Sequence, residues 1–255
     1  MPAKKRKTTT QPRAYKTRGI VLRGRQLGEA DRILTLLTTE RGKLDAVAKG
    51  VRRSGSHLAG RLEFGNECDL SMHRGRSLDV IVAAEIVSAP WIDLVRPERF
   101  AVASLAVELI DAFCEPDLAV PDIYSLLVGT LQAIAHSDTP QSVIPRFSLR
   151  LLEMLGLGPP CDDCVRCGAP LGADVVYVDA QAGGFIDDRC RERWRDLPSI
   201  TLEDRDNFRA VGADRGAGAT MNARIPVARA IDELITHHLG RRPKAGTQLA
   251  ELAQQ

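Results

Sequence analysis

Four of the six cysteines in this chain stand at a spacing that suits a metal ion. Cys161, Cys164 and Cys167 follow one another at C-x2-C-x2-C, and Cys190 follows after 22 intervening residues. Four thiolates in a tetrahedral array form a closed structural zinc site. The glycine after the third cysteine lets the backbone fold back, so that amide N–H groups reach the sulfurs. The spacing therefore predicts structural Zn²⁺ held by these four cysteines.

Other uses of these cysteines remain open or are disfavoured. Asp187 stands three residues before Cys190 and is the alternative to Cys161 as fourth ligand. An iron–sulfur run would continue as C-x3-C-P, which residues 165–171 lack. Disulfides conflict with the cytoplasmic location that we expect. The two other cysteines, Cys68 and Cys114, lie in apolar elements and are predicted core residues.

The charge of the chain is unevenly distributed. The net charge of +2 over 255 residues divides into +9 for residues 1–87 and −7 for residues 88–255. Such segregation predicts a basic unit for a polyanion, joined to an acidic body. The candidate nucleic-acid contacts are the arginines and lysines in and between the predicted strands: Arg18, Arg23, Arg25, Arg32, Arg41, Lys43, Lys49, Arg52, Arg53, Arg61, Arg74 and Arg76.

Nucleic-acid binding by these residues should depend on phosphate charge rather than on base stacking. Residues 15–87 offer only Tyr15 and Phe64 as aromatic platforms, and Phe64 fits a core position. We therefore expect weak sequence selectivity, binding of duplex as well as single strands, and a steep dependence on salt.

Several function classes are disfavoured by what the sequence lacks. It has no G-x4-G-K-[ST] phosphate-binding loop, no dinucleotide-binding glycine pattern, and no histidine tied to a cysteine by a motif. We expect a protein that is not an enzyme. No apolar run approaches the ~18 residues of a membrane span, and the N-terminus lacks an apolar signal stretch. No membrane association and a cytoplasmic, nucleoid-associated location are expected.

The elements that must position these residues change character along the chain. Five short segments bounded by turn residues predict strands at 19–23, 32–38, 43–48, 68–73 and 78–84, in the order of a five-stranded Greek-key OB-fold barrel. Later patterns predict helices at 100–114, 123–135, 144–155 and 227–239, the second capped by Asp122, with a hairpin at 175–186 between cysteines. Residues 191–221 are predicted to form short helices or loops.

The predicted organisation is an α+β multidomain chain. It comprises a disordered basic tail (1–14), the OB-fold barrel (15–87), a helical bundle (88–158), a four-cysteine zinc-binding module (159–192) carried by that bundle, and the remainder of the helical domain (193–255).

Sequence segments in both halves of the chain resemble those of one known family. Gly28-Glu29-Ala30-Asp31-Arg32-Ile33, Gly42-Lys43, Ala48-Lys49-Gly50-Val51-Arg52-Arg53 and Ser56 stand in the order and spacing of the bacterial RecO family of recombination mediators. The cysteine module with Cys167-Gly168 and Gly183-Gly184 is similar to the same family. Its members commonly end this module in a second C-x2-C, where this chain has Asp187-Asp188-Arg189-Cys190.

The resemblance implies a function without catalysis. It implies binding of single- and double-stranded DNA, annealing of complementary strands, and partnership with RecR and with the acidic, apolar C-terminal tail of the single-strand binding protein SSB, so that RecA is loaded on SSB-coated DNA. Arg146 and Arg150, with the helix around 100–114, are candidates for the groove that takes this tail. The alternative is a generic zinc-containing nucleic-acid-binding regulator.

Overall fold

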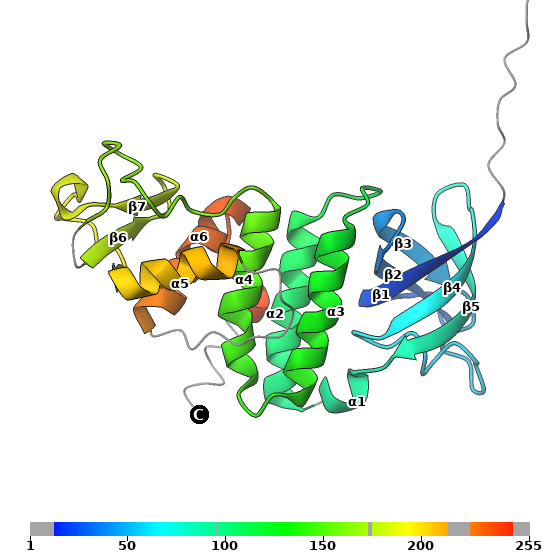
Figure 1. The fold of residues 1–255 in the computed structure, drawn as a ribbon. Helices are drawn as coiled ribbons and strands as arrows, with labels where there is room; N and C mark the ends of the chain where they lie inside the picture. Colours follow the sequence, from blue (N-terminus) through cyan, green and yellow to red (C-terminus); the bar gives the residue numbers. More distant parts are fainter. Residues whose placement is uncertain (1–12, 95, 173–174, 214–224, 247–255) are drawn as a thin grey trace, which may run out of the picture.

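A five-stranded, mostly antiparallel barrel occupies the N-terminal part of the chain (Figure 1). We describe it from a computed structural model that defines residues 13–94, 96–172, 175–213 and 225–246; the predicted tail lies outside these ranges except for its last two residues. The strands are β1 (Ala14–Leu27), β2 (Asp31–Thr38), β3 (Gly42–Ala48), β4 (Glu67–His73) and β5 (Asp79–Ser88).

The strand order confirms the predicted Greek-key barrel. The strands are hydrogen-bonded in the order β1-β2-β3-β5-β4, and β4 pairs back on to β1 over seven residue pairs. The seam between β3 and β5 is parallel and spans only three pairs. After β3 the chain makes a long excursion through residues 49–66 before β4 begins, and this excursion carries Lys49, Arg52, Arg53 and Arg61.

The middle of strand β1 is buried on both faces because it belongs to two cores. Val21 points into the barrel, where it joins Leu34 and Leu36 of β2. Ile20 and Leu22 point the other way and join the core of the helices. This explains the uninterrupted apolar run in β1, because successive residues of a strand face opposite sides.

The helices beside the barrel agree with three of the predicted segments. They are α1 (Trp91–Leu94), α2 (Pro97–Phe113), α3 (Pro121–His136), a 3₁₀ turn at Pro140–Ser142, and α4 (Val143–Met154). The predicted cap of α3 is wrong: the helix begins with Pro121 at its first position and Val120 as N-cap, which places Asp122 inside the first turn. Proline is favoured there because the first turn leaves its N–H unsatisfied anyway.

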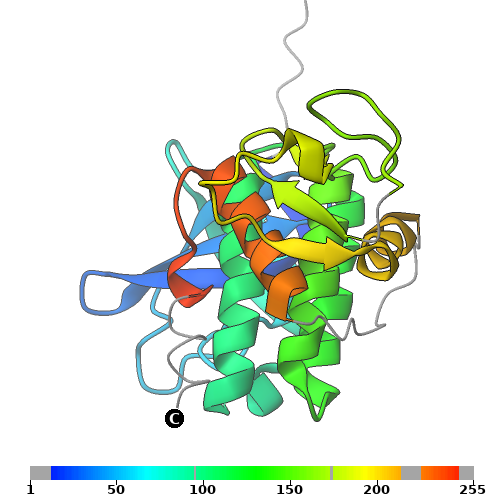
Figure 2. The same ribbon diagram turned by 90° about the vertical axis from the view of Figure 1, so that its left-hand side faces the viewer.

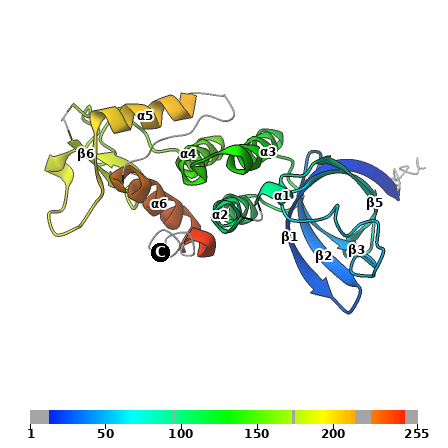
Figure 3. The same ribbon diagram turned by 90° about the horizontal axis from the view of Figure 1, so that it is seen from below.

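The chain then forms a small sheet that packs on the far side of the helices from the barrel (Figures 1 and 2). It contains β6 (Val175–Asp179), β7 (Gly184–Ile186) and β8 (Ser199–Thr201) in the order β7-β6-β8, with a 3₁₀ turn at Asp188–Cys190. Two helices accompany it, α5 (Leu202–Ala213) and α6 (Ile225–Leu239). Seen from below, α2, α3 and α4 separate this sheet from the barrel (Figure 3).

The barrel and the helices are joined by close backbone contact. The loop after α2 runs against the start of β3, where the Asp117 N–H donates to the Lys43 carbonyl at 2.8 Å. A Cβ on Gly42 would overlap the carbonyl oxygen of Leu118, and Gly42 has φ +64°, so this position requires glycine for two reasons. On α3, the buried Tyr124 hydroxyl donates to Glu67 of β4 at 2.8 Å.

Candidate nucleic-acid surface and candidate metal centre

Within the described part of the chain, five of the twelve basic residues predicted to contact nucleic acid are engaged in ion pairs. Two of these pairs lie on the barrel itself: Arg18 Nε is 2.8 Å from Asp69, and Arg32 Nη1 is 3.6 Å from Glu63. The other three residues, Arg23, Arg41 and Lys43, bind acidic residues outside the barrel.

Ion pairs between the barrel and residues outside it hold the barrel against the helices. Asp111 of α2 accepts from Arg23 Nε at 2.8 Å and lies 3.4 Å from the Lys43 ammonium. Arg41 pairs with Asp117 in the loop after α2 and with Asp79 of β5, the latter at 2.6 Å. These ion pairs therefore join the two parts of the chain.

The seven remaining predicted contacts are exposed, and no carboxylate pairs with them in the described part of the chain. They are Arg25, Lys49, Arg52, Arg53, Arg61, Arg74 and Arg76. An arginine without a carboxylate partner keeps its charge available for phosphate. Two of these arginines also use one guanidinium nitrogen on a backbone carbonyl, Arg52 on Glu29 and Arg61 on Ala84.

The first group of these exposed cations gathers where two loops meet. The Arg52 N–H donates to the Ala30 carbonyl at 2.9 Å, its guanidinium donates to the Glu29 carbonyl at 3.0 Å, and the Gly50 N–H donates to Asp31 at 2.7 Å. The loop that carries Lys49, Arg52 and Arg53 is thereby fixed on the turn between β1 and β2. Arg25 precedes this turn.

The second group lies at the turn between β4 and β5. Arg74 covers the Tyr15 ring at 4.9 Å from its centroid, and Arg41 lies 5.7 Å from it. The Tyr15 hydroxyl donates to Asp79 at 2.5 Å; burial, followed by this hydrogen bond, raises the pKa of Tyr15 to about 12. The aromatic side chain predicted to be available for stacking is therefore engaged within the protein.

Sequence reasoning missed one neighbour of this group. Arg13 was assigned to the tail, but its carbonyl accepts from the Arg74 N–H at 2.8 Å and its side chain is exposed. The only available signal was its position two residues before Tyr15, where the strand pattern begins.

Phe64 is not available for stacking either. Its ring packs against Phe100 of α2 with centroids 5.2 Å apart, in agreement with the predicted core position. The surface therefore offers charge and few aromatic faces.

Three of the four predicted metal ligands come together. The Sγ atoms of Cys164, Cys167 and Cys190 all lie within 4.8 Å of one another. Gly168 has φ +71°, and its N–H donates to the Cys164 carbonyl at 2.8 Å, which turns the chain sharply after the third cysteine. β6 and β7 form the predicted hairpin, which returns Cys190 to the other two thiols.

Cys164 is the thiol best prepared to bind a cation. Burial acts to raise its pKa, but the backbone N–H groups of Asp187, Cys167 and Arg166 approach its sulfur and lower the pKa to about 7. The hydrogen bonds of Cys190 with Cys167 and Cys164 raise the pKa of Cys190 to about 11. The thiolate, rather than the thiol, is the form that binds a metal ion.

Neither candidate fourth ligand has its ligand atom in this group of three. The Cys161 thiol donates to the Pro159 carbonyl at 3.3 Å, and burial raises its pKa to about 11. The Asp187 carboxylate instead accepts from Arg189 Nε at 3.0 Å, although its backbone N–H points at Cys164. Three clustered thiols are soft donors that suit zinc and similar ions. The fourth ligand stays a prediction.

The other cysteines and the suggested groove are also located. Cys68 and Cys114 are buried, as predicted for core residues. Arg146 and Arg150 are buried in α4, and Arg150 donates to the Val211 carbonyl at 3.3 Å. They do not form an exposed basic rim, because α5 covers this side of α4. Among the described residues, no helix has the length and apolar content to cross a bilayer.

Two family models match the chain one after the other. The model described as "Recombination protein O N terminal" matches residues 13–90, and "Recombination protein O C terminal" matches residues 95–246. The first match covers the barrel, and the second covers the helices, the small sheet β7-β6-β8 and the three clustered cysteines.

Individual relatives agree with these matches. A protein named DNA repair protein RecO from Bifidobacterium longum is 36% identical over 226 residues, which cover 87% of this chain and 90% of the relative. Proteins of the same name from Frankia casuarinae and Dehalococcoides mccartyi are 37% and 32% identical and cover 69% and 74% of this chain, and 73% and 75% of their own lengths. The chain belongs to the RecO family and has a role in DNA recombination and repair.

Proposed function

We propose that this protein is a non-catalytic recombination mediator. In this proposal it binds single- and double-stranded DNA through its barrel, anneals complementary strands, and acts with RecR to load RecA on SSB-coated DNA. Residues 15–87 form the DNA-binding unit, residues 159–192 the zinc module, and residues 88–158 and 193–255 the helical body, which meets protein partners.

The observation that carries this proposal is the division of the barrel's cations into two sets. One set pairs with acidic side chains, and the other set of seven is exposed without carboxylate partners in the described part of the chain. Phosphate neutralisation supplies most of the affinity of a weakly selective DNA-binding protein. The barrel presents the charge that such binding needs.

Annealing follows from the same chemistry. Cations that neutralise phosphates reduce the repulsion between two single strands. Because Tyr15 and Phe64 are engaged within the protein, the surface has few rings that would stack on bases and compete with pairing. Bases of a bound strand are therefore left available to a complementary strand.

The cysteine module supplies structure rather than chemistry in this proposal. Cys164, Cys167 and Cys190 hold Zn²⁺, with Cys161 as the proposed fourth ligand and Asp187 as the alternative. When bound, the ion ties the turn after Cys164 to the 3₁₀ turn that ends at Cys190. Metal content of Cys161→Ser and Asp187→Ala distinguishes the two ligands, since only loss of the true ligand lowers zinc retention.

The decisive experiment is annealing of complementary strands coated with SSB. The full chain should accelerate annealing of coated strands, and a variant with both Arg52→Gln and Arg53→Gln should anneal more slowly. A protein that binds DNA but leaves coated strands unannealed would be a generic nucleic-acid-binding regulator, and the mediator proposal would be wrong.

A further inference from the structure

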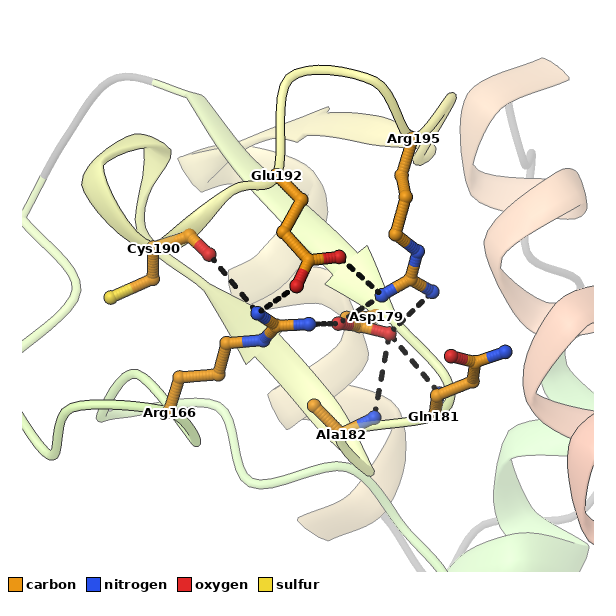
Figure 4. A network of polar contacts seen from close by, with 7 residues as sticks. All are labelled: Arg166, Asp179, Gln181, Ala182, Cys190, Glu192 and Arg195. Atoms are coloured by element: carbon orange, nitrogen blue, oxygen red, sulfur yellow. Dashed lines mark hydrogen bonds and ion pairs between the residues drawn. The ribbon is translucent and has the colours of Figure 1, made fainter.

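A buried carboxylate lies beside the cysteine cluster. Asp179, the last residue of β6, is 0% exposed. Its Oδ2 atom accepts from Arg166 Nη2 at 2.7 Å and from Arg195 Nη1 at 2.9 Å, and its Oδ1 atom accepts from Arg195 Nη2 at 3.0 Å (Figure 4). The backbone N–H groups of Gln181 and Ala182 also point at Oδ1, at 3.2 and 3.4 Å.

The two arginines come from the two segments that carry the thiols. Arg166 stands between Cys164 and Cys167, and Arg195 follows Cys190 by five residues. The Arg166 guanidinium also reaches the second segment directly, because Nη1 donates to the Cys190 carbonyl at 3.5 Å and to Glu192 at 3.3 Å (Figure 4).

The network is balanced in charge, and separating its charged groups is unfavourable in free energy. Two guanidiniums face two carboxylates, since Glu192 Oε2 lies 3.9 Å from Arg195 Nη1. Removing one partner of a buried ion pair leaves a charge without compensation, which destabilises more than the pair itself stabilises. The contacts around Asp179 therefore oppose separation of the two segments.

We infer that Asp179 is a positioning residue that holds the three thiols together before any metal ion arrives. This inference rests on the metal role proposed above. Many small zinc domains assemble their ligands only on binding, so folding and metal binding are one event. Here ion pairs, which need no metal ion, join the segment of Cys164 and Cys167 to the segment of Cys190. The metal-free module should therefore keep its fold.

The test compares metal affinity between the full wild-type chain and its variants. Co²⁺ alone, followed by its thiolate absorption, is the probe, with Zn²⁺ competition as a second measurement. Asp179→Asn is suited to the purpose because its side-chain oxygen still accepts from Gln181 and Ala182, while the charge that holds the arginines is lost. Glu108→Gln is the matched control, since Glu108 accepts from Arg241 and two backbone N–H groups far from the thiols in sequence.

We expect Asp179→Asn to bind Co²⁺ about 10- to 100-fold more weakly, the range seen when partners behind metal ligands are removed, and Glu108→Gln to bind as wild type does. Arg195→Lys keeps the charge but loses the two-pronged contact, so its affinity should be intermediate. Hydrogen exchange of the metal-free proteins is the second readout. Residues 164–172 and 175–190 should be protected in wild type and exchange quickly in Asp179→Asn, while α2–α4 stay protected in both.

The outcomes separate the two proposals. Wild-type protein that binds no Co²⁺ removes the metal site itself, and the inference with it. Wild-type binding with unchanged affinity in Asp179→Asn overturns the positioning role alone. Equal weakening by Glu108→Gln, or fast exchange of residues 164–172 and 175–190 in metal-free wild type, also overturns it.

Discussion

The division of the barrel's arginines predicts that two double substitutions, each removing two positive charges, have unequal effects on DNA binding. One variant carries Arg52→Gln and Arg53→Gln, which removes two exposed cations without carboxylate partners among the described residues. The other carries Arg23→Gln and Arg32→Gln, which removes two cations that pair with Asp111 and Glu63. Both variants lower the net charge by two, so long-range attraction changes equally.

The magnitude follows from the number of phosphates neutralised. If all seven exposed cations contact single-stranded DNA, the logarithm of the binding constant should fall with the logarithm of salt with a slope of about −5. Removing two contacts should reduce that slope to about −3.5 and weaken binding about 25-fold at ~0.1 M salt. The Arg23 and Arg32 variant should keep a slope near that of wild type.

The assay is fluorescence anisotropy of a labelled oligonucleotide without secondary structure, titrated at several salt concentrations between about 50 and about 200 mM. Unfolding by urea, measured on all three proteins, shows that they are folded. The reasoning is refuted if the two variants lose the same slope, or if the Arg23 and Arg32 variant loses more.

Three further predictions concern stability. Gly42→Ala should lower the free energy of unfolding by about 3 kcal/mol, because it combines a left-handed residue with overlap on Leu118, whereas Gly28→Ala, with φ +59° and open space, should cost only about 1 kcal/mol; urea unfolding measures both, and equal losses would contradict the close approach. Burial acts to raise the pKa of Glu108, but backbone N–H groups of its partner segment and an arginine outweigh it and lower that pKa below its ordinary value. Its stabilisation is therefore present at neutral pH and lost as the pH falls from about 5 through the depressed pKa, so wild type and Glu108→Gln should converge in stability in acid; a gap that stays constant would be inconsistent with this. Tyr124→Phe should cost about 1–3 kcal/mol in thermal unfolding because it leaves a buried carboxylate without its hydroxyl donor, and an unchanged melting temperature would argue against that bond.

The barrel was predictable because its signals are local. Each strand is bounded by turn residues, as at Gly28 and Gly42, which both have positive φ. The predicted segments were nevertheless short at their ends: β1 runs from Ala14 to Leu27, well beyond 19–23. Its charged ends are largely exposed. They are strand because their backbone pairs with β4 and β2, and a local sequence pattern does not report such pairing.

The last strand of the small sheet and the helix after it were not predictable in the same way. β8 has three residues, Ser199–Thr201, and exists through its pairing with β6, a partner distant in sequence. α5, the sequence LEDRDNFRAVGA, is mostly polar and shows no clear apolar stripe, although Phe208 and Val211 are buried. Short or weakly amphipathic elements are fixed by tertiary packing, which periodicity does not report.

The candidate site was predictable by residue type and less so by contact. Composition identified the basic residues, but whether an arginine meets Asp111 across 88 positions or stays exposed depends on the fold. Likewise, spacing identified Cys164, Cys167 and Cys190 as neighbours. The hydrogen bond of Cys161 to the Pro159 carbonyl is a local detail that no spacing rule anticipates.

The close packing of the loop after α2 against the start of β3 has a mechanical consequence. A hinge at this junction would need free space, and the close approach of Leu118 to Gly42, the Asp117 hydrogen bond and the Tyr124 hydrogen bond leave little. In the proposed function, a nucleic-acid strand bound to the barrel would then turn together with the whole molecule. Any protein seated on the helices would meet that strand at one fixed angle.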